Sequence, residues 1–569
     1  MKTKKMFGNL AKIAALILGV MMAFLSWGCG AAKSSAPTGA PFSQGMTSQS
    51  GGNHSNSTEA PAAAAPNMPA AEPPAAGYSG SASANRAPAD ANKYSQWETG
   101  QQVYADEEYL PITENPEKDA ASNPLITFSL KVDTASYRNV ARYIGSGNLP
   151  PADAVRVEEM INYFAYDQAL PENDAPFSIY AELGRSMFDE DKTLAFVRVK
   201  AKDADRSDLP RSSLTFLIDS SGSMASYDKL PLLKSSFGLL VDTLTENDTV
   251  SIVTYAGSSY VVLDSVAGDQ KQRIMDAINS LRSNGSTAGG VGINTAYALA
   301  EKNFIEGGNN RVILATDGDF NVGVSGVGEL EKLISDKRDS GVYLSVLGFG
   351  TENLKDNKME TLAKNGNGNY SYIDNADAAQ KVLVDELASN LYTIADDVKA
   401  QIEFNPALVG TYRLLGYENS VMANRDFAND AKDAGEIGVG TDVVMMFELT
   451  LTGGAQPLKY QSQTPAPAGD YSDELFEVRI RYKDPGQSES KLIAEPVKTA
   501  SVRSHNTGDF IFAECVAGFG QMLRGSEYAA GLGSAELLAA ARDSLGEDRG
   551  GYRREFVSIV EKYAGITGR

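Results

Sequence analysis

Three short polar segments carry the side chains whose types and spacing suggest chemistry. They are the D-S-S-G-S run at 219–223, the S-T-A-G-G loop at 286–290 and the T-D-G-D run that contains Asp317. A tight turn presents Ser221 and Ser223 to one point, and the carboxylates of Asp219 and Asp317 supply negative charge. Mg²⁺ prefers six oxygen ligands at about 2.0–2.1 Å, and hydroxyls, carboxylates and water are suitable ligands. The pattern predicts a site for Mg²⁺, with Mn²⁺ or Ca²⁺ as alternatives.

Two other interpretations of these residues are weaker. Asp317 begins a run with the acidic residues of an EF-hand calcium loop, but Val322 replaces the turn glycine and Gly328 replaces the bidentate glutamate. We interpret Asp319 and Asn321 as polar loop groups. A solvated turn is the alternative for the serine-rich run, because Ser and Asp are common in turns.

Composition excludes much of the usual enzyme chemistry. The 569 residues include 2 histidines and 2 cysteines, which leaves almost nothing to ligate zinc, haem or an iron–sulfur cluster. No G-x-x-x-x-G-K-[ST] phosphate loop and no G-x-S-x-G nucleophile elbow occurs, so we expect no nucleotide and no catalysis. The net charge of −22 disfavours nucleic acid, whose binding needs clustered Lys and Arg.

The elements that position the polar segments alternate between strands and helices. Short apolar runs predict strands at 214–218, 249–255, 311–315, 343–349 and 369–373. Amphipathic segments predict helices at 230–244, 270–281, 291–304, 327–338, 355–363 and 377–391. This alternation predicts an α/β fold with a mostly parallel sheet and helices on both faces. Such sheets bind ligands at the carboxyl ends of their strands, where the polar segments lie.

The flanking regions have a different pattern. Alternating apolar residues predict strands at 177–183, 193–200, 398–404, 412–417, 443–452 and 476–482. Helical spacing predicts helices at 133–144, after the Pro-Pro pair at 150–151, and at 510–523, 534–544 and 552–563, with Ser534 as an N-cap. Because strands occur on both sides of the centre, we predict a β-rich domain into which the α/β domain is inserted. Cys515 lies in an apolar helix and is predicted to be buried.

The centre resembles the von Willebrand factor A domain, which is Rossmann-like. The adhesion motif of that domain is D-x-S-x-S, then Thr, then Asp. The matching positions here are Asp219, Ser221, Ser223, Thr287 and Asp317. The resemblance implies that the serine hydroxyls bind the metal directly, and that the threonine and second aspartate alternate between direct and water-mediated contact. It also implies that the ion takes its last ligand from an Asp or Glu of a partner protein.

The flanks extend this resemblance to the YfbK-like bacterial von Willebrand A family. The matching segments are 133–137 (D-T-A-S-Y), 149–151 (L-P-P), 156–164 (R-V-E-E-M-I-N-Y-F), 433–438 (D-A-G-E-I-G) and the helix near 509–520. One departure is Thr441, which stands after Gly440 where the family pattern has His.

The first 28 residues predict a signal peptide. Four lysines precede an apolar run at 13–25, which is shorter than the roughly 20 residues that span a membrane. Cys29 follows in a segment that resembles a bacterial lipobox, so we predict that it is lipidated; an ordinary cleaved signal is the alternative. Gly30 is not Asp, which by analogy with Gram-negative sorting favours the outer membrane. The Ala-, Pro-, Ser- and Gly-rich stretch that follows predicts a disordered linker.

These patterns divide the chain into six parts. They are a signal peptide at 1–28, a lipid-anchored linker at 29–92, an N-terminal family region at 93–210, the von Willebrand A domain at 211–392, a β-rich continuation at 393–500 and a helical region at 501–569.

Three functions are compared. The first is a metal-dependent adhesion or scaffolding lipoprotein of the cell envelope, periplasmic or surface-exposed, whose metal binds a partner carboxylate. The second is an accessory subunit that uses the same site to recruit or assemble an envelope or secretion complex. The third is a hydrolase that uses acidic groups of the β-rich domain. Tyr227 and Tyr260 are expected at the rim of the site, where they can contact a partner.

Overall fold

The computed structural model describes residues 107–167, 171, 175–204, 209–285, 289–318, 327–351, 354–452 and 471–568. Within these ranges, no helix is both long and apolar enough to cross a membrane. All of these residues belong to one compact unit.

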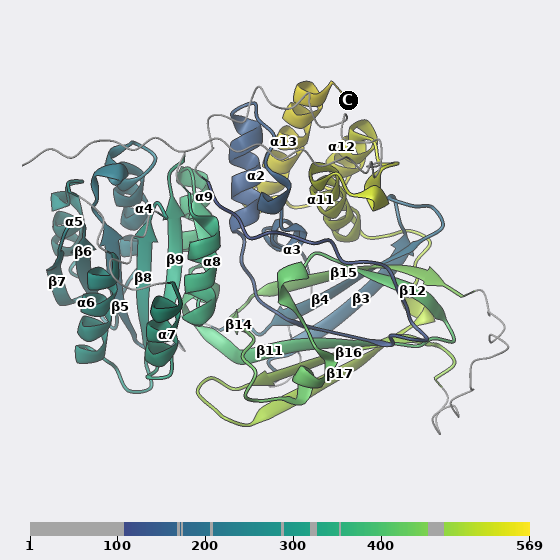
Figure 1. Cartoon of the computed structure of the whole chain (residues 1–569), viewed down its shortest axis with the longest axis horizontal. Helices are drawn as coiled ribbons and strands as arrows, with labels where there is room; N and C mark the ends of the chain where they lie inside the picture. Colours follow the sequence, from purple (N-terminus) through teal and green to yellow (C-terminus); the bar gives the residue numbers. More distant parts are fainter. Residues whose placement is uncertain are drawn as a thin grey trace, which may run out of the picture. The chain divides into compact units, whose positions relative to one another are not determined.

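The central sheet has six strands in the order β10-β9-β8-β5-β6-β7 (Figure 1). The first five of these run parallel, and β7 is antiparallel at the edge. The strands are β5 (Ser212–Asp219), β6 (Thr249–Tyr255), β7 (Ser259–Ala267), β8 (Asn309–Thr316), β9 (Tyr343–Phe349) and β10 (Tyr370–Ile373). Every residue of β5 and β8 is buried, because helices cover both faces of the sheet.

Helices of the centre fall into two sets by the core they share. One face carries α4 (Leu230–Thr243), α5 (Lys271–Ser280), α9 (Ala376–Gln380) and α10 (Leu387–Leu391). The opposite face carries α6 (Gly289–Lys302), α7 (Val327–Arg338) and α8 (Asp356–Asn365). The predicted α/β fold with a mostly parallel sheet is therefore confirmed.

The flanking strands form two further sheets that share one apolar core (Figure 1). The first sheet has the order β1 (Lys118–Asp119), β12 (Val409–Leu415), β15 (Asp442–Leu451), β4 (Thr193–Ala201) and β3 (Phe177–Arg185). The second has the order β13 (Val421–Met422), β2 (Leu125–Ser129), β11 (Thr393–Phe404), β16 (Glu474–Lys483) and β17 (Ser490–Lys498), with β14 (Gly435–Gly438) paired to β11. Both sheets combine strands from before and after the centre, so the predicted insertion is confirmed.

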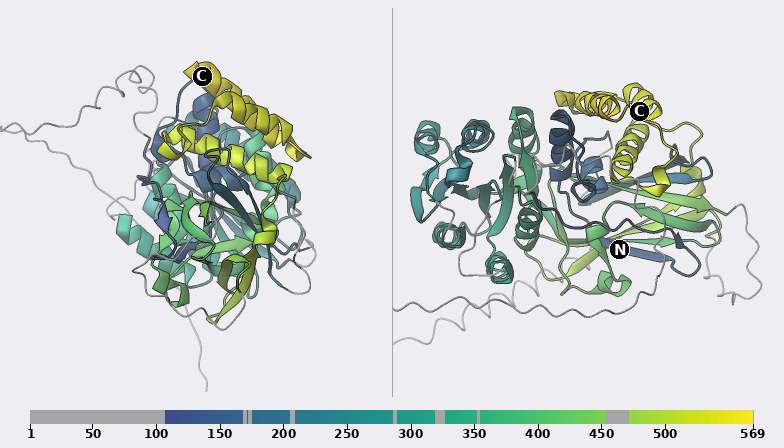
Figure 2. Two further views of the ribbon diagram at one scale, coloured as in Figure 1. Left: turned by 90° about the vertical axis from the view of Figure 1, so that its right-hand side faces the viewer. Right: turned by 45° about the horizontal axis from the view of Figure 1, so that its top comes forward.

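Five helices from the two ends of the described chain cover the outer face of the first sheet. They are α2 (Ala135–Gly145), α3 (Val157–Asn162), α11 (Gly508–Arg524), α12 (Ser534–Asp543) and α13 (Tyr552–Thr567). They share an apolar core with residues of β4 and β15, and that core contains the buried Cys515, as predicted. Figure 2 shows α2 beside the C-terminal helices in both views. Short 3₁₀ turns occur at Ala152–Ala154, Gly222–Ala225, Glu418–Ser420, Asn424–Ala428, Thr499–Ser501, Glu527–Ala529 and Arg549–Gly551.

Several predicted helices differ from the structure. The single helix predicted at 377–391 is divided into α9, a π-helical segment at Lys381–Asp385 and α10. The helix after the Pro-Pro pair is divided into a 3₁₀ turn and α3, because Arg156 adopts an extended conformation with φ −92° and ψ 106°. Ser534 is the first residue of α12 and its N-cap is Gly533, so the predicted cap was wrong. Strands β1, β2, β7, β13, β14 and β17 were not predicted.

Candidate metal centre

The serine-rich loop begins where β5 ends at the carboxyl edge of the central sheet. Asp219 is the last residue of β5, and its Oδ1 accepts a hydrogen bond of 2.8 Å from the backbone N–H of Ser221. The next residue, Ser220, donates its backbone N–H and its hydroxyl to the carbonyl oxygen of Tyr255 at the end of β6. Met224 then inserts into the core beneath the loop. The loop is therefore fixed at both ends.

A second loop is attached to the first by backbone hydrogen bonds. Asn284 N–H donates to the carbonyl of Ser220 at 2.8 Å, and Gly222 N–H donates to the carbonyl of Gly285 at 3.0 Å. These bonds place the residues that precede the predicted threonine loop directly beside the serines. Thr287 itself lies outside the described residues.

The two serine hydroxyls have the spacing that an octahedral ion requires. Ser221 Oγ and Ser223 Oγ are 2.9 Å apart, and they share a hydrogen bond. Adjacent ligands of an octahedral Mg²⁺ ion with bonds of about 2.05 Å are separated by about 2.9 Å. Ser221 is buried, whereas Ser223 is exposed to solvent. The distance between the two hydroxyl oxygens is thus compatible with adjacent positions on an octahedral ion.

Asp219 is oriented by hydroxyl groups. Its Oδ2 accepts hydrogen bonds from the Tyr255 hydroxyl at 3.0 Å and the Thr316 hydroxyl at 3.2 Å. Burial raises the pKa of Asp219 to about 6, and the hydrogen bonds from Ser221 oppose this rise. A carboxylate that is buried with neutral donors favours the arrival of a cation.

Asp317 follows β8, the strand that pairs with β5 in parallel. It is fully buried, and its Oδ2 lies 2.9 Å from the ammonium of Lys229, which immediately precedes α4. Gly318 follows with φ +88°, and a Cβ at that position would lie 2.6 Å from the backbone nitrogen of Lys355. The turn after Asp317 therefore requires glycine.

The structure brings together four of the six residues predicted to carry the metal site or the lipid anchor. They are Asp219, Ser221, Ser223 and Asp317. Thr287 and the predicted lipidation site Cys29 lie outside the described residues, so their roles remain predictions.

Sequence reasoning missed three residues that contact the two aspartates. These are Tyr255, Thr316 and Lys229. Tyr255 and Thr316 are the last residues of the two strands that pair with β5, and this position could have been recognised from the sequence. Nothing in the motif indicated Lys229.

Residues near the serine loop include exposed aromatic rings. Tyr227, between the serine loop and α4, is 86% exposed, and Tyr260, at the start of β7, is 66% exposed. Within the described ranges, no group of three or more His, Cys, Asp or Glu side chains is placed to hold a metal ion. A centre at the edge of the sheet would therefore depend on hydroxyl groups as much as on carboxylates.

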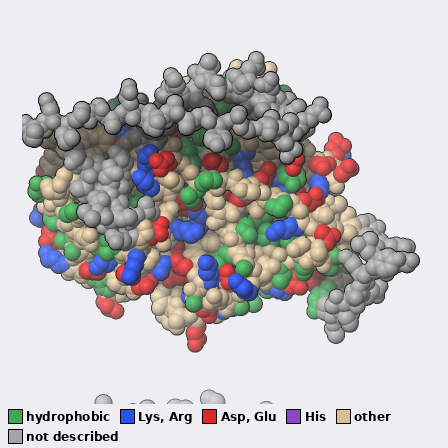
Figure 3. Space-filling model, in the orientation of Figure 1, with side chains coloured by type: hydrophobic (Ala, Val, Ile, Leu, Met, Phe, Trp, Pro, Cys, Tyr) green, Lys and Arg blue, Asp and Glu red, His purple; other side chains and the backbone are tan. Residues whose placement is uncertain are grey.

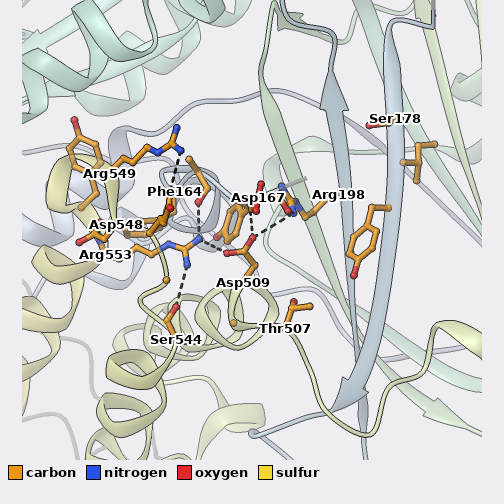
Figure 4. Close-up of a pocket in the computed structure, with 18 of the residues that line it drawn as sticks. Phe164, Asp167, Ser178, Arg198, Thr507, Asp509, Ser544, Asp548, Arg549 and Arg553 are labelled. Carbon is orange, nitrogen blue, oxygen red and sulfur yellow. Dashed lines mark hydrogen bonds and ion pairs between the residues drawn. The ribbon is translucent and has the colours of Figure 1, made fainter. Parts of the chain in front are cut away.

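A separate cavity of about 1080 Å³ is lined by β3, β4, β17 and the loops before α11 and α13 (Figure 4). Asp509 in this cavity accepts a hydrogen bond of 2.6 Å from Arg553, and Arg198 lies 3.7 Å from its other oxygen. Asp548 pairs with Arg554 at 3.1 Å. Because arginines engage both carboxylates, these two residues do not form the free pair that a carboxylate-based hydrolase uses.

On the face in Figure 3, acidic and basic side chains are interspersed.

Comparison with known proteins gives three family matches. A von Willebrand factor model matches residues 103–196, and a von Willebrand factor type A domain model matches residues 213–386. A model of the C-terminal region of uncharacterized protein YfbK matches residues 389–566.

One relative from Escherichia coli agrees with these family matches. Uncharacterized protein YfbK of Escherichia coli K12 is 46% identical over 470 residues, which are 81% of each chain. Among solved structures, von Willebrand factor type A from Catenulispora acidiphila has a TM-score of 0.39 and 15% identity, and the match covers 67% of this chain and 89% of that one. The conserved hypothetical protein BatB from Bacteroides thetaiotaomicron has a TM-score of 0.27 and 24% identity over 31% of this chain and 97% of its own. From the long match to the Escherichia coli protein, we conclude that this chain belongs to the YfbK-like family of von Willebrand factor type A domain proteins.

Proposed function

We propose that this protein is a metal-dependent protein-binding lipoprotein of the bacterial cell envelope, with an adhesion or scaffolding role. In this proposal Asp219, Ser221, Ser223, Thr287 and Asp317 hold Mg²⁺. The ion supplies an open coordination position that accepts a carboxylate from an Asp or Glu of a partner protein. The protein is not an enzyme in this proposal, because the oxygen groups of the site act as ligands of the ion and bind a partner carboxylate.

One observation carries the proposal. Two serine hydroxyls 2.9 Å apart lie beside Asp219, at the edge of the sheet where the buried Asp317 also lies. The neutral hydroxyls leave a coordinated cation electrophilic, which favours an anionic ligand. Tyr227 and Tyr260 are exposed, as they must be if they contact a partner.

The envelope location rests on the sequence of the N-terminus. A signal peptide, Cys29 and a long linker rich in Ala, Pro, Ser and Gly would place the folded part of the chain at a distance from the membrane. The exposed metal edge would then be available to proteins of the same envelope or of the surroundings.

Affinity capture tests the proposal. The full-length protein, purified in neutral detergent, is immobilised and incubated with envelope and extracellular fractions in Mg²⁺, in EDTA, and as a Ser221→Ala/Ser223→Ala variant in Mg²⁺. Ser226→Ala is the matched control, because Ser226 lies in the next turn and bonds to Asp228 instead of to the other serines. We expect a bound partner in the wild type and the control alone.

The outcomes separate the candidate functions. A host or matrix partner supports adhesion, whereas a partner from the same envelope supports the accessory role in assembly. A partner that binds equally in all conditions would contradict a metal-dependent function. Turnover of a substrate by the purified protein would favour the hydrolase.

A further inference from the structure

A buried lysine lies inside the candidate metal centre. The ammonium of Lys229 is 2.9 Å from Asp317 Oδ2, and the two residues are 6% and 0% exposed. Asp317 is therefore not simply an acceptor for a metal or its water, because one of its oxygens already accepts a hydrogen bond from an ammonium.

Packing against Gly350, in addition to the ion pair with Asp317, fixes the position of Lys229. Gly350 follows β9 with φ +81°, and a Cβ at that position would collide with Cε and Cγ of Lys229. The carbonyl of Gly350 also accepts a hydrogen bond of 2.6 Å from the buried Tyr372 hydroxyl. Glycine at 350 thus leaves a channel for the lysine stem, and the tyrosine holds the wall of that channel in place.

We infer that Lys229 is a resident counter-cation of the metal centre, which weakens cation binding and makes the loaded centre select an anionic ligand. This inference rests on the proposed function. It adds a residue outside the D-x-S-x-S…T…D motif that determines the specificity of the same site.

The charges of the buried groups carry the argument. Among the residues of the centre that the structure describes, Asp219 and Asp317 contribute two negative charges, and Lys229 contributes one positive charge. A divalent cation would be attracted by one net negative charge instead of two, so it binds more weakly than at an unpaired carboxylate couple. Once loaded, the centre has one net positive charge, whereas the same centre without the lysine would be neutral.

The positive charge of the metal-loaded centre determines which ligand the centre selects. A cationic, partly buried centre attracts a carboxylate and discriminates against the amide of the same shape, because only the carboxylate brings a compensating charge. The ligand class is therefore an Asp or Glu side chain, and an Asn or Gln at the same place is rejected. Lys229 therefore lowers the affinity of the centre for the cation and increases its preference for a carboxylate over an amide.

A titration of the full-length protein in detergent tests the inference. The variants are Lys229→Met and Lys229→Gln, and Lys234→Met is the control, because Lys234 lies on α4 and donates to the carbonyls of Asn279 and Leu281. Mn²⁺ affinity is measured by calorimetry, and then the binding of a Gly-Gly-Asp-Gly-Gly peptide and its Asn twin is measured at saturating Mn²⁺. We expect both Lys229 variants to bind Mn²⁺ at least ten-fold more tightly and to lose most of their preference for the Asp peptide.

A second measurement guards against misfolding of the variants. Without the ammonium the two buried carboxylates repel each other, so the metal-free variants should melt at a lower temperature and should gain more stability from Mn²⁺ than the wild type does. Unchanged Mn²⁺ affinity in the Lys229 variants, or an unchanged Asp preference, overturns the inference. If only the Lys229 variants bind Mn²⁺, the inference is supported but the proposed function of the wild type is contradicted. If neither the wild type nor the variants bind Mn²⁺, both are overturned.

Discussion

At the scale of single residues, neutral groups orient one carboxylate of the candidate centre, that of Asp219. Tyr255 and Thr316 donate to one oxygen of Asp219, while the backbone of Ser221 donates to the other. Each of these donors comes from a different chain segment at the same sheet edge. The orientation of Asp219 is thus fixed before any ion arrives, and an ion does not need to order it.

This arrangement predicts the effect of a tyrosine variant. Tyr255→Phe removes one hydrogen bond to a charged group, and such a bond contributes about 1.5–3 kcal/mol. We therefore expect Mg²⁺ to bind at least about ten-fold more weakly, measured by calorimetry on the full chain. Tyr297→Phe is the control, because the Tyr297 hydroxyl is buried in the same apolar core and has no hydrogen-bond partner among the residues that the structure describes. Equal Mg²⁺ affinity in the two variants would contradict the role of Tyr255.

A second residue-scale prediction concerns pH. Burial raises the pKa of Glu514 in α11 to about 8, although the backbone N–H of Met187 donates to its Oε1 at 2.6 Å. The folded protein therefore keeps Glu514 protonated over a range in which the unfolded chain has lost that proton. Its contribution to stability is complete below about pH 4.5 and is lost as the pH rises through about 8, at roughly 1.4 kcal/mol per pH unit.

The matched variant is Glu514→Gln, which keeps the oxygen that Met187 contacts. We expect the free energy of unfolding of this variant to fall less than that of the wild type between pH 5 and pH 8. Urea titrations at both pH values measure the difference. Parallel losses in the two proteins would show that Glu514 does not titrate in this range.

At the scale of elements, a buried ionic network joins the inserted domain to the N-terminal helices. Arg156, just before α3, pairs with Glu159 at 2.5 Å and with Asp356 of α8 at 2.7 Å. Close by, Lys131 pairs with Glu360 of α8 at 3.1 Å. The helix α8 of the central sheet is therefore attached to α3 by charges that are removed from water.

Removal of one partner from this network should be costly. Arg156→Met leaves two buried carboxylates without their cation, which typically reduces the free energy of unfolding by about 3–5 kcal/mol. Arg185→Met is the control, because Arg185 and its partner Glu190 are both exposed, and its effect should stay within about 0.5 kcal/mol. Chemical denaturation followed by circular dichroism compares them. A small effect of Arg156→Met would indicate that water enters this network.

Elements with strong periodicity were predictable from the sequence, and those shaped by distant contacts were not. β5 and β8 are buried on both faces, so their continuous apolar runs identify them. β7 and β17 are edge strands with exposed side chains, so their patterns resemble loops. The helix at 377–391 has good helical spacing, but its π-helical segment contains Lys381, whose ammonium lies 4.7 Å from the ring of Tyr163 and 4.9 Å from that of Tyr552. No local pattern contains those two contacts.

The same division applies to the site. The motif identified Asp219, Ser221, Ser223 and Asp317 because their spacing follows from the ends of two parallel strands. Lys229 escaped prediction because it reaches Asp317 only through the space that Gly350 leaves. Sequence spacing therefore predicts which polar side chains meet at adjacent strand ends, whereas side chains that enter from a neighbouring loop require the packed structure.

At the scale of the whole molecule, the inserted domain is continuous with the β-rich domain at its end. α10 ends at Leu391, and β11 begins two residues later at Thr393. The carbonyl of Tyr392, between them, accepts a hydrogen bond from Val439, in the turn after β14. A force that a bound partner exerts on the carboxyl edge of the central sheet would therefore be transmitted to the two flanking sheets through a short, hydrogen-bonded connection.

The proposed function also includes an anchor that attaches the chain to the membrane, and this anchor gives the last prediction. In the proposed function, lipid on Cys29 holds the protein at the membrane, and the linker rich in Ala, Pro, Ser and Gly connects it to the folded part. Cys29→Ala removes the acceptor sulfur. We expect the variant to move from the membrane pellet to the soluble fraction and to lose incorporation of labelled palmitate. Cys515→Ala is the control, because Cys515 is fully buried in α11, so its removal should leave both readouts unchanged. Retention of the Cys29 variant in the membrane, with no change in labelling, would contradict the lipid anchor and would move the attachment to another part of the chain.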